Sequence, residues 1–291
     1  MLFRSEDVLY VIVRRTINGV QKRYVERMQT RQISTLENCF FVDSGATYNG
    51  TNTTATTVTV TGGTTWEPSE SLTITASSAI FTGTGDINDA IVLTATDGTK
   101  YRLRITGYTS TTQVTARVDK TLGTAFRGVA TTSWAFARNT ISGLSWLEGK
   151  AVSILADGAV IHGQIVTGGT VSLPRACVIV TVGLPYQSDL QTLPLALNIE
   201  GFGQGRYKNV NKAWLRVFQS SGIFIGPDAN NLTEAKQRTN EPYGSPPSLK
   251  SAEILVMITP SWADSGQVYV RQSDPLPLAI VGLTLEVSIG G

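Results

Sequence analysis

Short runs of apolar residues, separated by turns, recur along almost the whole chain. Where apolar and polar residues alternate within such a run, the pattern is typical of a β-strand with one buried face. The runs predict strands over residues 113–119, 133–138, 176–184, 211–219, 252–259, 267–272 and 278–288. Weak helix patterns occur only at 30–40 and 228–239. We therefore expect an all-β fold.

Three two-residue turns predict β-hairpins, because Asn-Gly and Asp-Gly favour the tight turn that joins two antiparallel strands. The hairpins are expected over 8–28, 90–106 and 151–166, with turns at Asn18-Gly19, Asp97-Gly98 and Asp157-Gly158. In the second hairpin, a strict two-residue turn pairs Thr96 with Thr99. The residues that would then share one face are Val92, Thr94, Tyr101 and Leu103.

The first hairpin has two unusual features. Its run at 8–13 is apolar on both faces, so it requires cover on both sides and neighbours at its edges. In the expected register Arg14 faces Arg23 and Arg15 faces Lys22, although like charges in such positions destabilise a sheet by up to about 1 kcal/mol per pair. These four cations are a candidate contact for a nucleic-acid phosphate or for carboxylates of a neighbouring subunit, with a solvated tip as the alternative.

Composition suggests how the chain is divided. A Thr-rich segment at 47–65 reads either as a loose polar hairpin or as a linker, and a block with its own apolar alternation follows at about 66–140. We expect this block to be a small β-barrel and 46–140 to be an insert. The remaining parts, 1–45 and 141–291, are expected to form one discontinuous antiparallel β domain of the sandwich or barrel type.

Charge and cysteine content exclude several classes of protein. Charged residues make up 16% of the chain, below the usual quarter or so, and the net charge is +2, so no overall field points to nucleic acid or a membrane surface. The two cysteines, Cys39 and Cys177, are too few for a disulfide framework or a zinc site, and we expect both to be buried. No apolar run approaches the roughly 20 residues of a membrane-spanning helix.

Candidate catalytic chemistry is sparse. His162, the only histidine, is expected opposite Ser153 in the third hairpin, which suggests a nucleophile and its base but is far more typical of a polar cross-strand pair. The segment 201–208, GFGQGRYK, resembles a phosphate loop but has Arg206 where the third glycine should stand. No His/Cys cluster has metal-ligand spacing. We therefore expect no enzymatic activity and no catalytic, cofactor or metal site.

Five segments, taken together and in order, resemble the C-terminal part of tail nozzle (tail tubular) proteins of short-tailed bacteriophages. They are LYVIVRRTINGVQKRYVERM, FFVDSGATYNG, ISGLSWLEGKAVSILADGAV, VTVGLPYQSDLQTLPL and VYVRQSDPLPLAIVGLTLEV. The block at about 79–138 is similar to the first catalytic-cysteine half-domain of ubiquitin-activating enzymes, a likeness of fold that implies no ubiquitin chemistry.

The resemblance implies a structural protein of the virion tail, assembled in the cytoplasm of the host bacterium. Copies would form a ring, expected to be a hexamer, contact neighbouring tail adaptor proteins, and leave a channel through which genomic DNA is ejected without being read. Members of full length carry a β-propeller-like region before this part. We therefore expect a fragment, a split gene product or a shortened relative, with 8–28 as the last strands of that region.

Two other functions remain open from the residues alone. The first is a carbohydrate-binding or receptor-binding β module in which Trp66, Trp134 or Trp146 is exposed as a stacking platform. The second is a glycan hydrolase, because its paired carboxylates are set by the fold and not by sequence spacing. Exposure of the three tryptophan rings distinguishes the first alternative from a tail component, since a buried ring cannot stack on a sugar.

Overall fold

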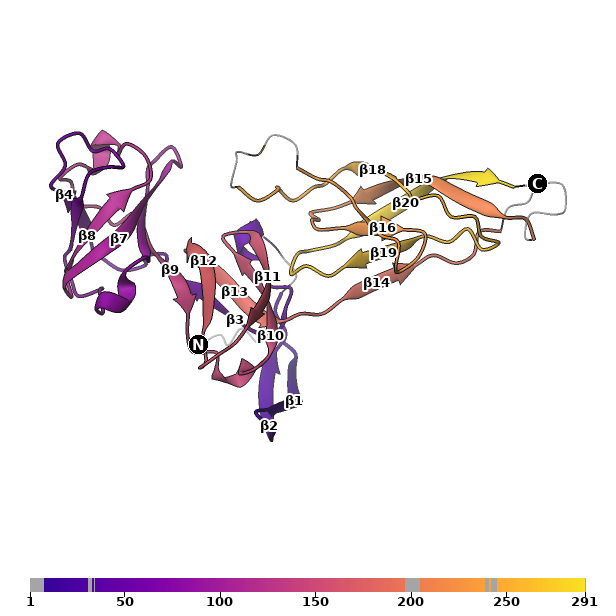
Figure 1. The fold of residues 1–291 in the computed structure, drawn as a ribbon, viewed down its shortest axis with the longest axis horizontal. Helices are drawn as coiled ribbons and strands as arrows, with labels where there is room; N and C mark the ends of the chain where they lie inside the picture. The colour runs from indigo at the N-terminus through magenta and orange to yellow at the C-terminus, as the bar shows by residue number, and fades with distance from the viewer. Residues whose placement is uncertain are drawn as a thin grey trace, which may run out of the picture.

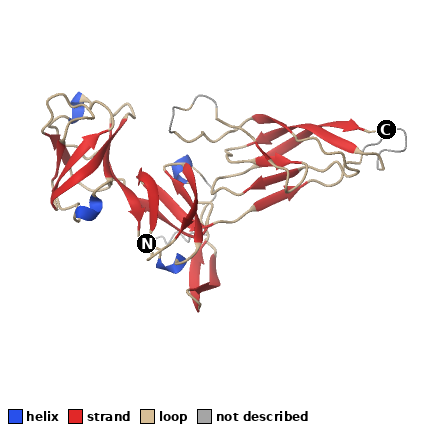
Figure 2. Cartoon of the chain, in the orientation of Figure 1, coloured by secondary structure: helices blue, strands red, loops and turns tan. Residues whose placement is uncertain are grey.

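The computed structural model describes residues 8–30, 33, 35–196, 205–238, 241 and 245–290. In this part the chain is all-β, as expected: every strand pairing is antiparallel, and helix is limited to short 3-10 turns (Figure 2). The turns are η1 (Leu36–Asn38), η2 (Thr84–Asp86), η3 (Thr124–Phe126) and η4 (Ser145–Leu147). None of the described helices is long and apolar enough to cross a membrane.

Of the two weak helix predictions, the one at 228–239 is wrong for the residues described. The side chain of Asp228 accepts hydrogen bonds from the backbone N–H groups of Asn230 and Asn231 at 2.8 and 3.1 Å, which closes a turn. Such Asx turns compete with helix formation. Strand β17 (Thr233–Glu234) follows the turn.

The strands form five sheets. The first is the hairpin β1 (Tyr10–Ile17) and β2 (Val20–Arg27). A four-stranded sheet has the order β11 (Ala159–Ile165), β10 (Ala151–Ala156), β13 (Ile179–Leu184), β3 (Asp43–Asn49). A seven-stranded sheet has the order β12 (Val171–Cys177), β9 (Trp134–Ile141), β6 (Ala90–Thr94), β7 (Lys100–Ser110), β8 (Gln113–Val118), β5 (Leu72–Ala76), β4 (Val58–Thr61).

Two further sheets face each other towards the C-terminus. One has the order β14 (Ser188–Gln191), β19 (Tyr269–Gln272), β16 (Phe224–Gly226), β17. The other has the order β18 (Glu253–Met257), β15 (Lys208–Val217), β20 (Ile280–Ile289). Buried residues of both sheets, such as Leu215 and Val270, belong to one hydrophobic cluster, so the pair is a β-sandwich.

Three large hydrophobic clusters divide the described chain into three bodies (Figure 1). The insert body is built from β4 to β8 and the first half of β9, the middle body from β3, β10 to β13 and the second half of β9, and the C-terminal sandwich from β14 to β20. The range 141–291, expected as the second part of one domain, thus holds two of these cores. The division into 1–45, 46–140 and 141–291 stays a prediction.

The seven-stranded sheet, which runs from β12 of the middle body through the insert body, does not close into a barrel. Its hydrogen-bonded order ends at β12 on one side and β4 on the other. The edge strand β4 reaches the segment before β9 only through isolated bridges, Val58 to Thr131 and Val60 to Arg127. The expected small barrel is therefore an open, curled sheet around the core of Leu72, Ile91 and their neighbours.

The Thr-rich segment forms strands at both of its ends and connects two bodies between them. Its first residues lie in β3, where the hydroxyls of Thr47 and Thr181 are 3.0 Å apart, and its last residues form β4, which pairs with β5. Between these strands the chain passes from the middle body to the insert body at Gly50, beside the returning strand β9: Phe136 N–H donates to the carbonyl oxygen of Gly50 at 2.7 Å. The two crossings are therefore adjacent.

The register of the hairpin at 90–106 differs by one residue from the expectation. Ile91 pairs with Leu103 and Leu93 with Tyr101, so these four residues face the insert core together. The cause is a three-residue loop: Ala95 N–H donates to Thr99 O at 2.8 Å, and the Asp97 carboxylate accepts from Thr99 N–H. A shift of one residue moves every side chain to the other face.

Candidate functional site

The hairpin β1–β2 carries the predicted cationic site, and its geometry follows from the turn. Asn18 and Gly19 both have positive φ, 48° and 75°, which is the conformation that the Asn-Gly dipeptide favours. The expected pairs are confirmed: Arg14 lies opposite Arg23 and Arg15 opposite Lys22. In Figure 1 the hairpin projects from the middle body and has no other strand beside it.

Arg15 differs from the other three cations because its charge is paired with carboxylates of the same chain. Its guanidinium donates to both carboxylate oxygens of Glu26, at 2.9 and 3.1 Å, and to Asp43 at 3.0 Å. These hydrogen bonds, that of Glu26 above all, raise the pKa of Arg15 above its usual value. Since Asp43 opens β3, the interaction ties the hairpin to the middle body and leaves Arg15 committed to its own chain.

The remaining cations lie at the tip of the hairpin. Arg14, Lys22 and Arg23 are exposed and, with Gln21, line an open pocket of about 440 Å³. The pocket has no buried polar wall, so it offers charge without a defined geometry for a small anion. A macromolecular surface that carries several negative groups therefore suits this pocket better than a single small anion.

The two faces of the hairpin differ in burial. The inner face carries Arg15, Tyr24 and Glu26, which are half-buried. The outer face is exposed along its whole length: Tyr10, Ile12 and Val25 expose 61%, 75% and 71% of their surface. A sheet face of this kind is seldom left in water, because large exposed apolar patches mark interaction surfaces.

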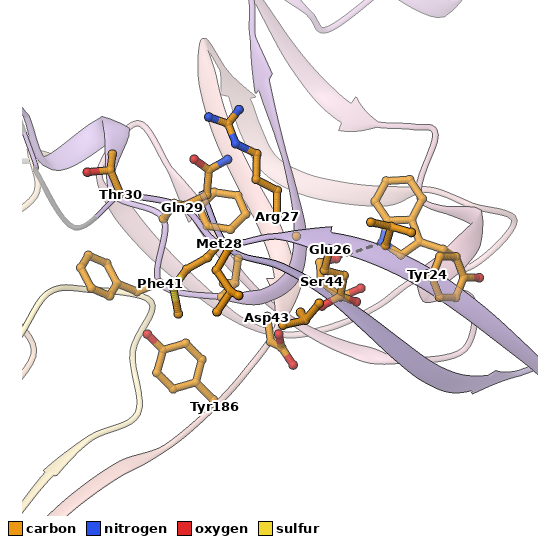
Figure 3. A pocket seen from close by; sticks show the side chains of 17 residues that line it. Tyr24, Glu26, Arg27, Met28, Gln29, Thr30, Phe41, Asp43, Ser44 and Tyr186 are labelled. Carbon is orange, nitrogen blue, oxygen red and sulfur yellow. Dashed lines mark hydrogen bonds between the residues drawn. The ribbon is translucent and has the colours of Figure 1, made fainter. Parts of the chain in front are cut away.

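A groove lies between the base of the hairpin and the middle body, with a volume of about 540 Å³. Figure 3 shows Met28, Phe41 and Tyr186 gathered around one part of it and the Asp43 carboxylate beside them. The Asp43 side chain is 54% exposed although it accepts from Arg15. The groove is thus mainly apolar, and its lining also includes the exposed carboxylate of Asp43 and the side chain of Arg27.

The structure does not form the Ser153–His162 pair. A bulge between Val152 and Ile154 leaves Ser153 without a partner on β11, and it pairs instead with Gly183 of β13. Its buried Oγ has no hydrogen bond among the described residues. His162 is exposed instead, with Nε2 3.2 Å from the carboxylate of Asp274 in the C-terminal sandwich. Burial raises the pKa of Asp274, and His162 offsets part of that rise.

The other sequence candidates form no site in the part of the chain that the structure describes. Residues 201–204 of the glycine-rich segment lie outside the described residues. Of its last residues, Lys208 is buried and its ammonium donates to the carbonyl oxygens of Arg206 and Asp264 at 3.2 and 2.7 Å. No group of three or more His, Cys, Asp or Glu side chains is placed to hold a metal among the described residues.

None of the three tryptophans considered as sugar platforms is exposed. Trp134 retains 8% of its surface in the insert core and donates to Thr56 O. Trp146 and Trp66 are half-buried; the first donates to Ser44 O, and the guanidinium of Arg127 covers the second. None of the three rings therefore stands exposed as a platform, although Trp146 lines the groove beside the hairpin.

Comparison with known proteins adds no relative. No protein-family model matches the chain, and no curated protein matches it. Function is therefore inferred from the surfaces described above and from the resemblance of the five sequence segments.

Proposed function

We propose that this chain is a structural component of a short bacteriophage tail, part of the nozzle or tube through which genomic DNA leaves the virion. The observation that carries the proposal is the hairpin β1–β2. Neither of its strands has a further neighbour among the described strands, and its outer face exposes Tyr10, Ile12 and Val25. An isolated hairpin is marginal in water, so this one is suited to incorporation into a larger assembly.

In this role the chain is not an enzyme and needs no cofactor. Its copies pack around an axis as a homo-oligomeric ring, a hexamer if it follows the tail nozzles that its segments resemble, and neighbouring tail adaptor proteins complete the tube. A closed ring leaves no copy with an unused patch, because each head-to-tail contact repeats until the ring closes. The bore admits DNA without reading its sequence.

Electron microscopy of intact virions tests this proposal. We expect density for this chain in a ring around the DNA channel of the tail. Absence from the particle, or a place in a trimeric side fibre, contradicts the proposal, and the fibre would favour the receptor-binding alternative. The experiment uses the assembled particle because the proposal concerns the place of the chain in the virion.

A further inference from the structure

The outer face of the hairpin combines apolar and cationic residues and carries no carboxylate. The cross-strand pair Ile12–Val25 occupies its middle, and the pair Arg14–Arg23 lies next to it towards the tip. The acidic residue of the hairpin, Glu26, lies on the other face, where it binds Arg15. Among the residues of the hairpin, the pair Arg14–Arg23 therefore places positive charge beside an apolar centre, with no carboxylate on the same face.

This combination fits a protein surface better than a nucleic acid. Binding to a nucleic-acid backbone is dominated by cations that neutralise phosphates. Ile12 and Val25 would then face phosphates and water and gain nothing. On a protein, the same two side chains are buried while Arg14 and Arg23 meet carboxylates.

The chain itself has a surface of this complementary kind. The groove beside β3 is lined by the exposed apolar side chains of Leu9, Met28 and Tyr186, and Asp43 gives it an exposed carboxylate. The groove and the outer face adjoin, because Val25 belongs to both, but Ile12, Arg14 and Arg23 do not line the groove. A contact between them is heterologous, and repeated contacts of this type close into a ring when the rotation allows.

We infer that the outer face of the β1–β2 hairpin of one copy packs over the groove of the next copy, so that Arg14 and Arg23 meet the carboxylate of Asp43. The contact also explains why two arginines are placed opposite each other. Their repulsion destabilises the free hairpin, and a carboxylate placed between them removes it. The inference rests on the proposed function, since it specifies the contact that builds the ring.

A charge exchange between two variants of the full chain tests the contact. In Arg14→Glu/Arg23→Glu two carboxylates of the hairpin meet the carboxylate of Asp43. In Asp43→Lys an ammonium in the groove meets the two arginines of the hairpin. In an equimolar mixture each altered surface finds a complementary partner. We expect each variant to associate about 10-fold or more weakly than the original chain in sedimentation velocity, and the mixture to recover association.

The matched controls change the same charges elsewhere on the surface. Arg117→Glu/Lys120→Glu alters two exposed cations of the insert body, and Asp264→Lys alters an exposed carboxylate of the C-terminal sandwich. Both controls are expected to associate like the original chain, and circular dichroism shows which variants are folded. Ile12→Ser is expected to weaken association without changing any charge, and it provides a second measure if Asp43→Lys does not fold.

Three results overturn the inference: an original chain that stays monomeric up to its solubility limit, variants that associate like the original chain, or folded variants whose mixture does not recover. These results leave the proposed function in place, because electron microscopy of the virion decides it separately. A ring in the tail whose copies touch through other surfaces refutes only the contact described here. Absence of the chain from the virion refutes the proposed function instead.

Discussion

Gly50 lies against the backbone of Phe136, at the point where the chain passes from the middle body to the insert body. A Cβ atom at this position would be 1.8 Å from the carbonyl oxygen of Phe136, which no side-chain movement relieves. Its own N–H donates to Val178 O and its carbonyl accepts from Phe136 N–H, so the residue is held by both neighbours. The need for glycine here comes from close approach and not from a positive φ.

We predict that Gly50→Ala destabilises the chain by about 3 kcal/mol or more, because the strands on both sides must separate. The measurement is chemical denaturation followed by fluorescence. Gly205→Ala is the matched control, since no atom of the described residues lies within 4 Å of a Cβ built there. An equal denaturation midpoint for the two variants would contradict the close approach of the backbone at Gly50 to the backbone at Phe136.

Cys39 and Cys177 confirm the expectation of buried small residues. Both are free thiols with at most 1% of their surface exposed, and burial raises the pKa of each to about 11. At neutral pH the thiolate, which is the reactive form, is therefore scarce and inaccessible.

Neither thiol is expected to react with an aromatic disulfide reagent in the folded chain near neutral pH, and both are expected to react after unfolding in guanidinium. Absorbance of the released thiol counts the reactive groups. Rapid reaction of one thiol before unfolding would show that its strand opens locally, which the buried clusters around Cys39 and Cys177 do not suggest.

At the scale of elements, β9 joins two bodies within one strand. Its first half pairs with β6 and contributes Trp134 and Phe136 to the insert core. Its second half pairs with β12 and contributes Ile141 to the middle core. Between these halves Arg138 donates to the carboxylates of Asp86 and Asp89, at 3.0 and 3.1 Å, and both carboxylates are buried. The insert is thus attached by more than its two chain crossings.

A deletion series tests where the insert ends. Replacing 52–134 by a short Gly/Ser linker is expected to leave the middle body and the C-terminal sandwich folded, because the adjacent crossings at Gly50 and Phe136 are kept. Replacing 46–140 removes Tyr48 and half of β9 from the middle core, so we expect a less stable product. Thermal denaturation of both proteins measures the difference, and equal stability would contradict it.

At the scale of the whole molecule, the middle body and the C-terminal sandwich meet in a small apolar cluster. Cys39 and Leu155 of the middle body pack there with Leu276 of the sandwich. The pair of His162 and Asp274 lies at the same junction, with the nitrogen and oxygen 3.2 Å apart. Burial disfavours the charged form of Asp274, and His162 compensates only in part, so the pKa of this carboxyl is raised above 3.8.

This shift predicts how pH affects the junction. A carboxyl whose pKa is higher in the folded state binds more protons there than in the unfolded state, so stability falls as pH rises from below 3.8 through the raised pKa. Asp274→Asn has no such group, and we expect its free energy of unfolding to decrease less over that range. Urea denaturation at a series of pH values checks the difference in slope, and parallel profiles would contradict it.

Local chemistry allowed much of the fold to be predicted from the sequence. The dipeptides Asn18-Gly19 and Asp157-Gly158 adopt positive φ in the structure and begin hairpins in the expected register, because a turn depends on a few neighbouring residues. The alternation of apolar residues gave the all-β class for the same reason. At Asp97-Gly98 the loop has three residues and not the expected two, so the other face of the first strand points to the core.

Contacts between distant residues could be decided only by the tertiary structure. Asp43 takes Arg15 out of the cationic tip, Asp274 and not Ser153 meets His162, and the groove beside the hairpin exists only after β3 is placed. The separation of 141–291 into two cores has the same origin, since both parts show the same strand pattern. The alternation of apolar and polar residues along a strand determines which of its faces is apolar. Which other strand covers that face depends on packing between residues far apart in the sequence, and the local pattern carries no information about it.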